Sequence, residues 1–512
     1  MKSKIIIFLS LIFASCSLLE EQNYNNFNSD EYFQNTSQIQ TALFGVYEPL
    51  KYLTNYSQYM GNLGTDETRY YSGSTDILAL DTYGFDANNS YVISLWTYLF
   101  RGVYYANSAI EGIESSELDE EVKAPYLGEA KFLRGLYYYY LVRYYGAVPL
   151  LTSPSDSYES SMTPLESISD IYDQIVEDFT AAGELLPSTQ ALLGRATSGA
   201  GYSFLAAAYL SMTGYPLYKN TVADYQKVID AAQKVIDLDV YELLSEYGAV
   251  FDSENHAESI FEFQAGWEVG SGASMKTFMG VVGQYPVVQH QNDPDMHYPD
   301  LRVGTANIRP VRKFAESYED GDTRKETNIA DYYLAGVTAE GTIVTSLTYI
   351  ADIVSVEKVY LTDNFDKLGI AKFKFPEGTD VTLFTTNDNP LNFALMRYSE
   401  LLLIMAEAQY HVGGYEASKP YFEQVSSRAG ATTWDGIGNI DDRILDERAW
   451  ELCFESKRFF DLQRLGKLKE YVDQRDSEYK PSDYSSYQEV IVPSTFTFYP
   501  IPTEEYDYNL NI

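Results

Sequence analysis

Basic residues are scarce in this chain of 512 residues, which has 36 Lys and Arg against 74 Asp and Glu and a formal net charge of −38. Proteins that bind nucleic acid or anionic lipid through their surface need clustered Lys and Arg, because these side chains displace the counterions of phosphate groups. The composition therefore argues against a nucleic-acid partner. It favours an uncharged ligand over a polyanionic one.

Cysteine and histidine are also rare, with two and four residues. Cys16 lies at the end of an N-terminal leader, so Cys453 has no partner for an intramolecular disulfide. No cluster of Cys and His has the spacing of a zinc site. The Asp-rich stretches 293–295 and 320–322 lack the spaced oxygen ligands and terminal Glu of an EF-hand. We therefore expect no metal and no cofactor.

Long apolar runs are missing except for a short one at the N-terminus. After two lysines, residues 5–12 form an apolar stretch that is too short to cross a membrane and has the length of a signal peptide. It ends in Phe13-Ala-Ser-Cys16, where small residues before a Cys have the pattern of a lipobox. A plain secretory signal with an incidental Cys is the alternative.

These features predict how the N-terminus is processed and anchored. We expect a signal peptide at 1–15, and a lipidated Cys16 that begins a polar, flexible tether at 16–35. The protein would then be attached to a membrane through lipid without crossing it.

Apolar residues recur at helical spacing through much of the chain. Between Trp96 and Ile113 they fall every three or four residues. The same spacing predicts helices at 133–144, 168–186, 204–212, 225–236, 393–411, 416–428 and 442–465. Paired helices of this length predict a mostly α fold, in which TPR-like helix pairs form a superhelical scaffold.

The stretch from about 250 to 390 has a different character, because Gly, Thr, Val, Asp, Pro and aromatic residues mix there without helical periodicity. We expect long loops and short strands, which is where function is usually found on a rigid scaffold. The tail from Tyr499 onward is predicted to be extended. The predicted organisation is an N-terminal helical region at 36–245 and a loop-rich C-terminal region at 246–512 with closing helices.

Tyrosine is abundant, with 47 residues beside 26 Phe and 4 Trp. Sugars present flat C–H faces and hydroxyl groups, so aromatic platforms flanked by polar side chains bind them. Three stretches have this composition, and each could instead be a structural loop. The candidate ligand-binding residues are Asp66, Arg69, Tyr70 and Tyr71 in the first, Trp267 in the second, and Tyr285, His290, Asn292 and Tyr298 in the third.

Charged residues on the predicted helices form no catalytic constellation. Eight of them alternate with apolar residues at helical spacing, and we interpret them as structural ion pairs: Glu129, Arg134, Arg143, Glu447, Arg448, Glu455, Arg458 and Asp461. Nothing marks the two carboxylates, roughly 5–10 Å apart, that glycoside hydrolysis requires. Cys453 lies in an apolar helix and is interpreted as a core thiol. We therefore do not expect an enzyme.

Several motifs follow one another in a fixed order along nearly the whole chain. They include Ala42-Leu-Phe-Gly-Val-Tyr47, Gly128-Glu-Ala-Lys-Phe-Leu-Arg134, Gly146-Ala-Val-Pro-Leu150, Met396-Arg-Tyr-Ser-Glu400, Glu447-Arg-Ala-Trp-Glu-Leu452 and Tyr499-Pro-Ile-Pro502. As an ordered set they resemble the SusD/RagB family of outer-membrane nutrient-binding lipoproteins. The acidic pair Glu20-Glu21 resembles the surface-export signal of Bacteroidetes lipoproteins. Residues 423–430 depart from the family's Asn-x-Val-Arg-x-Arg-Ala-Gly pattern, which indicates a divergent branch.

The resemblance implies a lipoprotein that is exposed on the cell outer membrane and held there by lipid on Cys16. It implies that the protein binds a nutrient, above all a poly- or oligosaccharide, and delivers it to a SusC-like TonB-dependent transporter without changing it. Three alternatives stay open at this point. They are a peptide-binding, RagB-like partner of such a transporter, a surface glycoside hydrolase, and a scaffold for protein interaction alone.

Overall fold

The computed structural model describes residues 33–71, 73–155, 157, 162–266, 307–338, 341, 343–344, 353–360, 368–373, 391–431, 434–475, 490–509 and 511–512. The predicted signal peptide, Cys16 and most of the tether lie outside the described residues, as do five of the predicted ligand-binding residues. These five are Trp267, Tyr285, His290, Asn292 and Tyr298.

Helices dominate the described fold, as the periodicity predicts. The N-terminal half contains α3 (Thr36–Tyr47), α4 (Pro49–Met60), α5 (Thr75–Thr82), α6 (Ser90–Ser115), α7 (Glu120–Tyr145), α9 (Ile168–Leu185), α10 (Ser198–Thr213) and α11 (Val222–Ile236). Several begin at a side-chain cap that satisfies a free backbone N–H, such as Asn35 in α3, Ser167 in α9 and Thr221 in α11.

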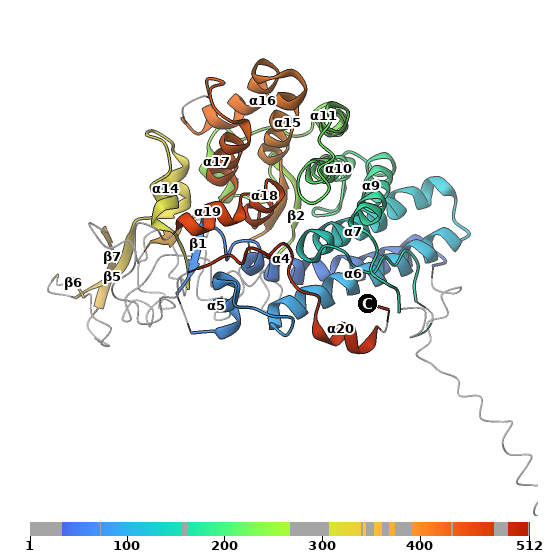
Figure 1. Ribbon diagram of the computed structural model, residues 1–512. Coiled ribbons are helices and arrows are strands. Elements are labelled where there is room, and N and C mark those ends of the chain that lie inside the picture. The colour runs from blue at the N-terminus through green and yellow to red at the C-terminus, as the bar shows by residue number, and fades with distance from the viewer. Residues whose placement is uncertain are drawn as a thin grey trace, which may run out of the picture.

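Consecutive helices pack against each other to form one array. In chain order, α6 packs on α7, α7 on α9, α9 on α10, and α10 on α11. The array then continues from α11 onto α15 (Tyr398–Gly413) and α16 (Tyr415–Arg428), which lie beside it in Figure 1. Gly201 allows α9 and α10 to approach closely, since a Cβ there would lie 2.5 Å from the backbone nitrogen of Gly183. The mostly α fold with TPR-like pairs is thus confirmed.

Much of the tyrosine is structural. In α7, Tyr137 to Tyr140 are all buried, together with Tyr144 and Tyr145. The hydroxyl of Tyr137 donates to the backbone oxygen of Val46, and burial raises its pKa well above the usual value. No helix among the described residues combines the length and the apolar character needed to cross a bilayer.

The C-terminal helices correct three details of the sequence-based prediction. Strand β9 (Phe393–Arg397) stands where the helix 393–411 was predicted to begin, because it pairs antiparallel with β2 (Ser259–Phe263). The helix predicted at 442–465 is two helices, α17 (Ile440–Leu452) and α18 (Arg458–Arg464). After α19 (Leu468–Arg475), the tail is extended only as far as Pro502, because α20 (Thr503–Tyr508) follows it.

The break between α17 and α18 has a local cause. Phe454 and Ser456 adopt positive φ angles of 65° and 63°, which a helix cannot accommodate. The turn is held by the N-terminal part of the chain, since Ser456 N donates to Asn62 Oδ1 (3.1 Å) and Phe454 N donates to Glu67 Oε2 (3.2 Å). Sequence-distant contacts therefore override the helical propensity here.

The stretch between α11 and α15 contains short elements, as predicted. They are η1 (Tyr247–Phe251), α13 (Arg312–Ala315), α14 (Arg324–Asn328) and antiparallel strands. β1 (Thr68–Tyr70) pairs with β3 (Ile308–Pro310), and β4 (Ile329–Ala330) pairs with β8 (Gly369–Ile370). β5 (Tyr332–Thr338) lies between β6 (Ile343–Val344) and β7 (Ile353–Tyr360), and these three strands project from the helical body in Figure 1.

Candidate functional site

The first predicted ligand stretch, Asp66 to Tyr71, runs from the end of α4 into β1. The carboxylate of Asp66 accepts two hydrogen bonds from the guanidinium of Arg458 (2.8 and 2.7 Å). The side chains of Arg69 and Tyr70 are buried, and the Tyr70 hydroxyl accepts a hydrogen bond from Ser74 N. These contacts give Asp66 and Tyr70 structural roles. The predicted ligand role of this stretch stays a prediction that depends mainly on Tyr71.

Tyr71 lies half-buried at the end of β1. Its backbone N–H donates to the oxygen of Asn307 (2.7 Å), and the guanidinium carbon of Arg309 lies 4.8 Å from the centre of its ring. Residue 307 is where the chain re-enters the described fold after 267–306. The described residues on either side of the stretch 267–306 are called its two bases. Tyr71 therefore lies at one base of the stretch that carries the other predicted ligand-binding residues.

The other base of that stretch is a cluster of amide side chains at the ends of β2 and β9. Asn392 Nδ2 donates to Glu262 Oε2 and to Gln264 Oε1, both at 3.0 Å, and Asn392 Oδ1 accepts from Ala265 N at 2.9 Å. Asn255 and Gln264 exchange two further hydrogen bonds of 3.0 Å. Residues 266 and 391, which lead into the stretches 267–306 and 374–390, are thereby held close together.

Beside this cluster lies a small hollow that is lined by the kinds of side chain that bind sugars. Aromatic rings, amides and carboxylates meet in it, including Phe251, Phe373, Asn392, Glu254, Glu262 and His256. Its volume of about 40 Å³ holds only a few water molecules. Burial raises the pKa of the Glu254 carboxyl, which accepts a hydrogen bond from Asn392 N. The hollow is thus an edge of a site, and is too small to take a sugar ring by itself.

A buried ion cluster lies at the other end of β2 and β9 from the amide cluster. Glu451 of α17 accepts from Arg324, Arg397 and Arg428, which come from α14, β9 and α16. Arg397 also forms ion pairs with Glu258, which precedes β2, and with Glu455 (2.6 and 2.8 Å). Lys372 reaches the same Glu455 at 2.7 Å. The segments that carry the loop bases are therefore fixed to the helical scaffold by charge pairs away from solvent.

The charged residues singled out on the predicted helices form structural ion pairs, as interpreted from sequence. Examples are Arg134 with Asp178 (2.7 Å) and Arg448 with Asp461 (2.8 Å). The three-residue spacing of Arg458 and Asp461 predicts a pair along one helix, and this is wrong, because Arg458 pairs with Asp66 and Asp461 pairs with Arg448 of α17. Each reaches another segment, and sequence spacing gives no signal of such contacts.

Arg143 is a second correction. No hydrogen bond or ion pair joins it to a carboxylate within the part of the chain that the structure describes. Its guanidinium carbon instead lies 3.6 Å from the ring centre of Phe460 and 4.4 Å from that of Tyr139. These are cation–π contacts, which sequence spacing does not reveal.

Cys453 is a core thiol, as predicted. It is fully buried, and burial raises its pKa to about 12. Because the thiolate is the reactive form, we expect a maleimide to leave Cys453 unmodified in the folded protein at about pH 8 and to label it once urea unfolds the chain. Mass spectrometry would show this, with free glutathione as the control. Labelling of Cys453 in the folded protein would contradict it.

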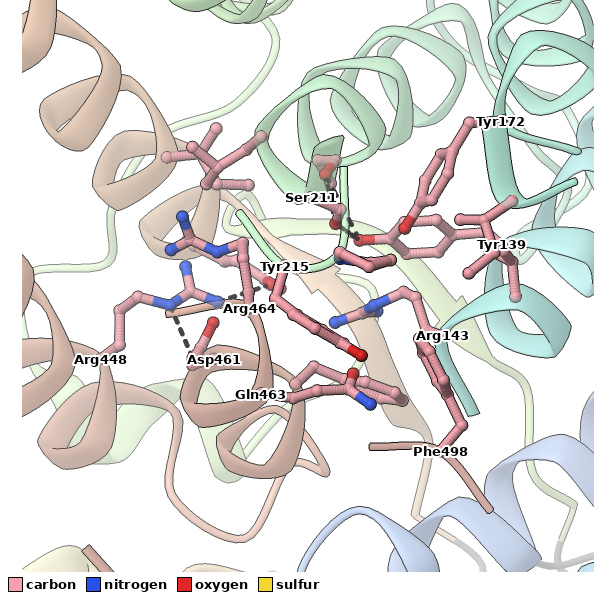
Figure 2. Close-up of a pocket in the computed structure, with 18 residues that line it drawn as sticks. Tyr139, Arg143, Tyr172, Ser211, Tyr215, Arg448, Asp461, Gln463, Arg464 and Phe498 are labelled. Carbon is pink, nitrogen blue, oxygen red and sulfur yellow. Dashed lines mark hydrogen bonds and ion pairs between the residues drawn. The ribbon is translucent and has the colours of Figure 1, made fainter. Parts of the chain in front are cut away.

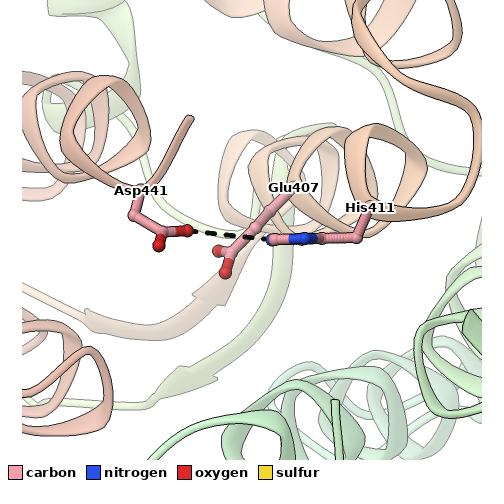
Figure 3. A group of neighbouring side chains, drawn as sticks. All are labelled: Glu407, His411 and Asp441. Atoms are coloured by element: carbon pink, nitrogen blue, oxygen red, sulfur yellow. Dashed lines mark ion pairs between the residues drawn. The ribbon is translucent and has the colours of Figure 1, made fainter. Parts of the chain in front are cut away.

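One group of possible metal ligands was missed in the sequence because Asp441 lies on α17, whereas Glu407 and His411 lie on α15. Glu407, His411 and Asp441 place their ligand atoms within 4.8 Å of one another (Figure 3). Both oxygens of Glu407 already accept from Arg464 (2.6 and 2.8 Å), and His411 lowers the pKa of the Asp441 carboxyl. We therefore interpret the group as an ion-paired contact between α15, α17 and α18.

Comparisons with known proteins agree with this architecture. A SusD family model matches residues 257–512, and a model described as "Starch-binding associating with outer membrane" matches residues 17–210. SusD-like protein P25 of Formosa agariphila is 24% identical over 530 residues, which cover 93% of this chain and 92% of that protein.

Two solved structures have the same fold. A SusD homolog from Bacteroides thetaiotaomicron superposes with a TM-score of 0.74 at 21% identity, covering 94% of this chain and 97% of that one. Surface glycan-binding protein A from Bacteroides fluxus gives a TM-score of 0.71 at 22% identity, covering 93% and 97%. Because the family model spans half of the chain and the shared fold extends over most of it, the chain belongs to the SusD family.

Proposed function

We propose that this protein captures a neutral glycan at the cell surface and delivers it, chemically unchanged, to a SusC-like TonB-dependent transporter. The observation that carries the proposal is the placement of polar and aromatic side chains at the two bases of the stretch 267–306. Tyr71 and Arg309 lie at one base, and the Asn255–Gln264–Asn392 amide cluster lies at the other. Aromatic rings beside fixed amides are the groups that sugar faces and hydroxyls require.

Charge and family membership support the finer parts of the proposal. A formal net charge of −38 disfavours acidic polysaccharides, since like charges repel at the surface. The name of the Bacteroides fluxus neighbour, a surface glycan-binding protein, supports a glycan ligand. Membership of the SusD family supports the transporter partner, and the lipobox at Cys16 supports lipid anchoring at the outer membrane.

The proposal includes that the protein does not cleave the glycan. Several buried carboxylates are engaged in ion pairs, as Glu451 is with three arginines and Asp66 is with Arg458. A carboxylate held in this way cannot turn toward a glycosidic bond without leaving a buried cation unpaired.

Isothermal titration against a panel of neutral and acidic polysaccharides tests the proposal. We expect the purified protein to bind a neutral glycan, and Tyr71→Ala or Trp267→Ala to weaken that binding about tenfold, because each removes an aromatic stacking surface. Tyr70→Ala is unsuitable as a test, because Tyr70 is buried and its loss would disturb the fold.

The matched control is Tyr506→Ala, which removes an exposed tyrosine from α20 and should leave the affinity unchanged. If no polysaccharide of the panel binds and peptides co-purify with the native protein, the ligand is a peptide and not a glycan. Release of shorter sugars from any bound glycan would show that the protein cleaves it and would contradict this part of the proposal. Failure of a transporter to co-purify from native membranes would contradict the delivery step.

A further inference from the structure

A second hollow lies in the helical array, between α7, α10, α15 and α18. Three arginines line it, Arg143, Arg448 and Arg464, together with hydroxyl-bearing side chains such as Tyr139, Ser211 and Tyr215 (Figure 2). Half-buried residues form its rim, among them Tyr215, Gln463 and Phe498. It is distinct from the candidate glycan site, because the two hollows share no lining residue.

The carboxylates near this hollow are already engaged. Asp461 and Glu400 both accept from Arg448, and Glu400 also pairs with Lys457 (2.8 Å). Arg464 is engaged by both oxygens of Glu407. Four cations therefore face three carboxylates, and the unbalanced positive charge is that of Arg143. A local cationic surplus is unusual in a chain of net charge −38.

Arg143 is held in place without a polar partner. The rings of Phe460 and Tyr139 carry its guanidinium at 3.6 and 4.4 Å, which fixes the plane and leaves the N–H groups free to donate. In Figure 2 the polar ends of Arg143, Tyr215 and Gln463 point toward one another within the hollow.

Arg448 adds to the positive charge around the hollow. The side chain of Arg448 is only 5% exposed, and its Nη1 atom is buried with no hydrogen-bond partner, although Nε and Nη2 are both engaged. A buried guanidinium N–H without an acceptor is costly. In Figure 2 this guanidinium lies beside that of Arg464, away from the polar ends of Arg143 and Tyr215, so it adds to the positive charge around the hollow without reaching a ligand held by Arg143. The same arginine lines the hollow.

From these contacts we infer that the hollow binds a small carboxylate of the size of formate or acetate. Its oxygens accept from the guanidinium of Arg143, from the Tyr215 hydroxyl and from the Gln463 amide, whose polar ends point toward one another (Figure 2). The volume of about 40 Å³ corresponds to about three water positions, which matches three or four non-hydrogen atoms and excludes a sugar ring. A bound carboxylate would join α7, the turn that follows α10, and α18, which carry Arg143, Tyr215 and Gln463, and so stabilise the array.

The test is the thermal unfolding midpoint of the purified protein in sodium acetate, with sodium chloride and sodium phosphate of equal ionic strength as parallel series. A ligand that binds only the folded state raises the midpoint in a saturable way. We expect this rise in acetate, with Arg143→Gln weakening acetate binding about tenfold or more, since a charge-assisted hydrogen bond is lost. Tyr215→Phe removes one hydroxyl at the rim and should weaken acetate binding in a protein that still folds.

Arg101→Gln is the matched control, because Arg101 also lies over a tyrosine ring (Tyr98, 4.7 Å) but is exposed on α6 and lines neither of the two hollows described above. It should bind acetate like the unmodified protein. The proposal is overturned by a midpoint that rises equally in chloride, by tighter binding of phosphate, or by acetate binding that survives in both Arg143→Gln and Tyr215→Phe.

Discussion

Replacing Arg397 with methionine is expected to lower the free energy of unfolding by about 3–5 kcal/mol, because the change leaves buried carboxylates without their cation. Arg397 is 1% exposed and donates to Glu258, Glu451 and both oxygens of Glu455 at 2.6 to 3.1 Å. Methionine keeps most of the side-chain stem, so the loss reports the charge more than the packing.

The measurement is urea unfolding followed by tyrosine and tryptophan fluorescence at neutral pH. Arg312→Met is the matched control. Arg312 forms an equally short pair with Glu316 (2.7 Å), but both side chains are exposed. Exposed pairs between residues four apart on a helix contribute about 0.3–0.5 kcal/mol, so this variant should unfold almost like the parent. If both variants lost the same free energy of unfolding, the buried ion pairs of Arg397 would contribute no more than an exposed pair, which would contradict the prediction.

The effect of Arg397 should extend to ligand binding. Arg397 ends β9 and pairs in register with Ser259 of β2, and Glu258 immediately precedes that strand. The amide cluster of Asn392 and Gln264 lies at the other end of the same two strands. Loosening the ion cluster would therefore move the bases of the stretch that we propose to contact the glycan.

The helical scaffold could be predicted from sequence, since its signal is local. The apolar stripe of α6 and the boundaries of α9 follow from spacing and caps within the segment itself. The strand at 393–397 could not, because Phe393, Leu395 and Met396 are all buried, and periodicity does not distinguish a buried strand from a buried helix. The break after Leu452 contains no Gly or Pro to mark it.

The contacts around the candidate site could not be predicted from the sequence, because they join distant parts of the chain. The sequence around Asp66 predicts only a polar loop residue. It gives no sign of the partner, Arg458, which lies 392 positions later. Tyr70 and Tyr71 are neighbours of the same type, yet one is buried and the other half-buried, since strand pairing with β3 turns them to opposite faces. Composition therefore does not tell which side chain of the predicted stretch is more exposed.

Glu67, next to Asp66, leads to the second large expected effect. It is buried at 1% exposure, and its carboxyl accepts from Phe454 N at the break between α17 and α18. Burial raises its pKa from 4.5 to about 8, an increase that the positive charge of Arg458 only partly offsets. At neutral pH the folded protein therefore holds Glu67 in its protonated, neutral form.

The sign of the pH dependence follows from the two protonation states. In the unfolded chain the carboxyl releases its proton near pH 4.5, whereas the folded state keeps it up to about pH 8. Between these values the folded state binds more protons than the unfolded state, so the contribution of Glu67 to stability falls as the pH rises. Below pH 4.5 the carboxyl is protonated in both states and contributes no such dependence.

Glu67→Gln removes this titration while keeping the shape and the acceptor oxygen for Phe454 N. We expect the variant to be more stable than the parent by about 2–4 kcal/mol near pH 8 and equal to it near pH 4.5, as each pKa unit corresponds to about 1.4 kcal/mol. Urea unfolding at a series of pH values measures the difference, with Glu111→Gln on the exposed face of α6 as the control. A difference that does not grow with pH would mean that Glu67 is ionised in the fold and balanced by Arg458. The loop before Tyr71 would then be held by an ion pair of Glu67, and not by a hydrogen bond to a neutral Glu67.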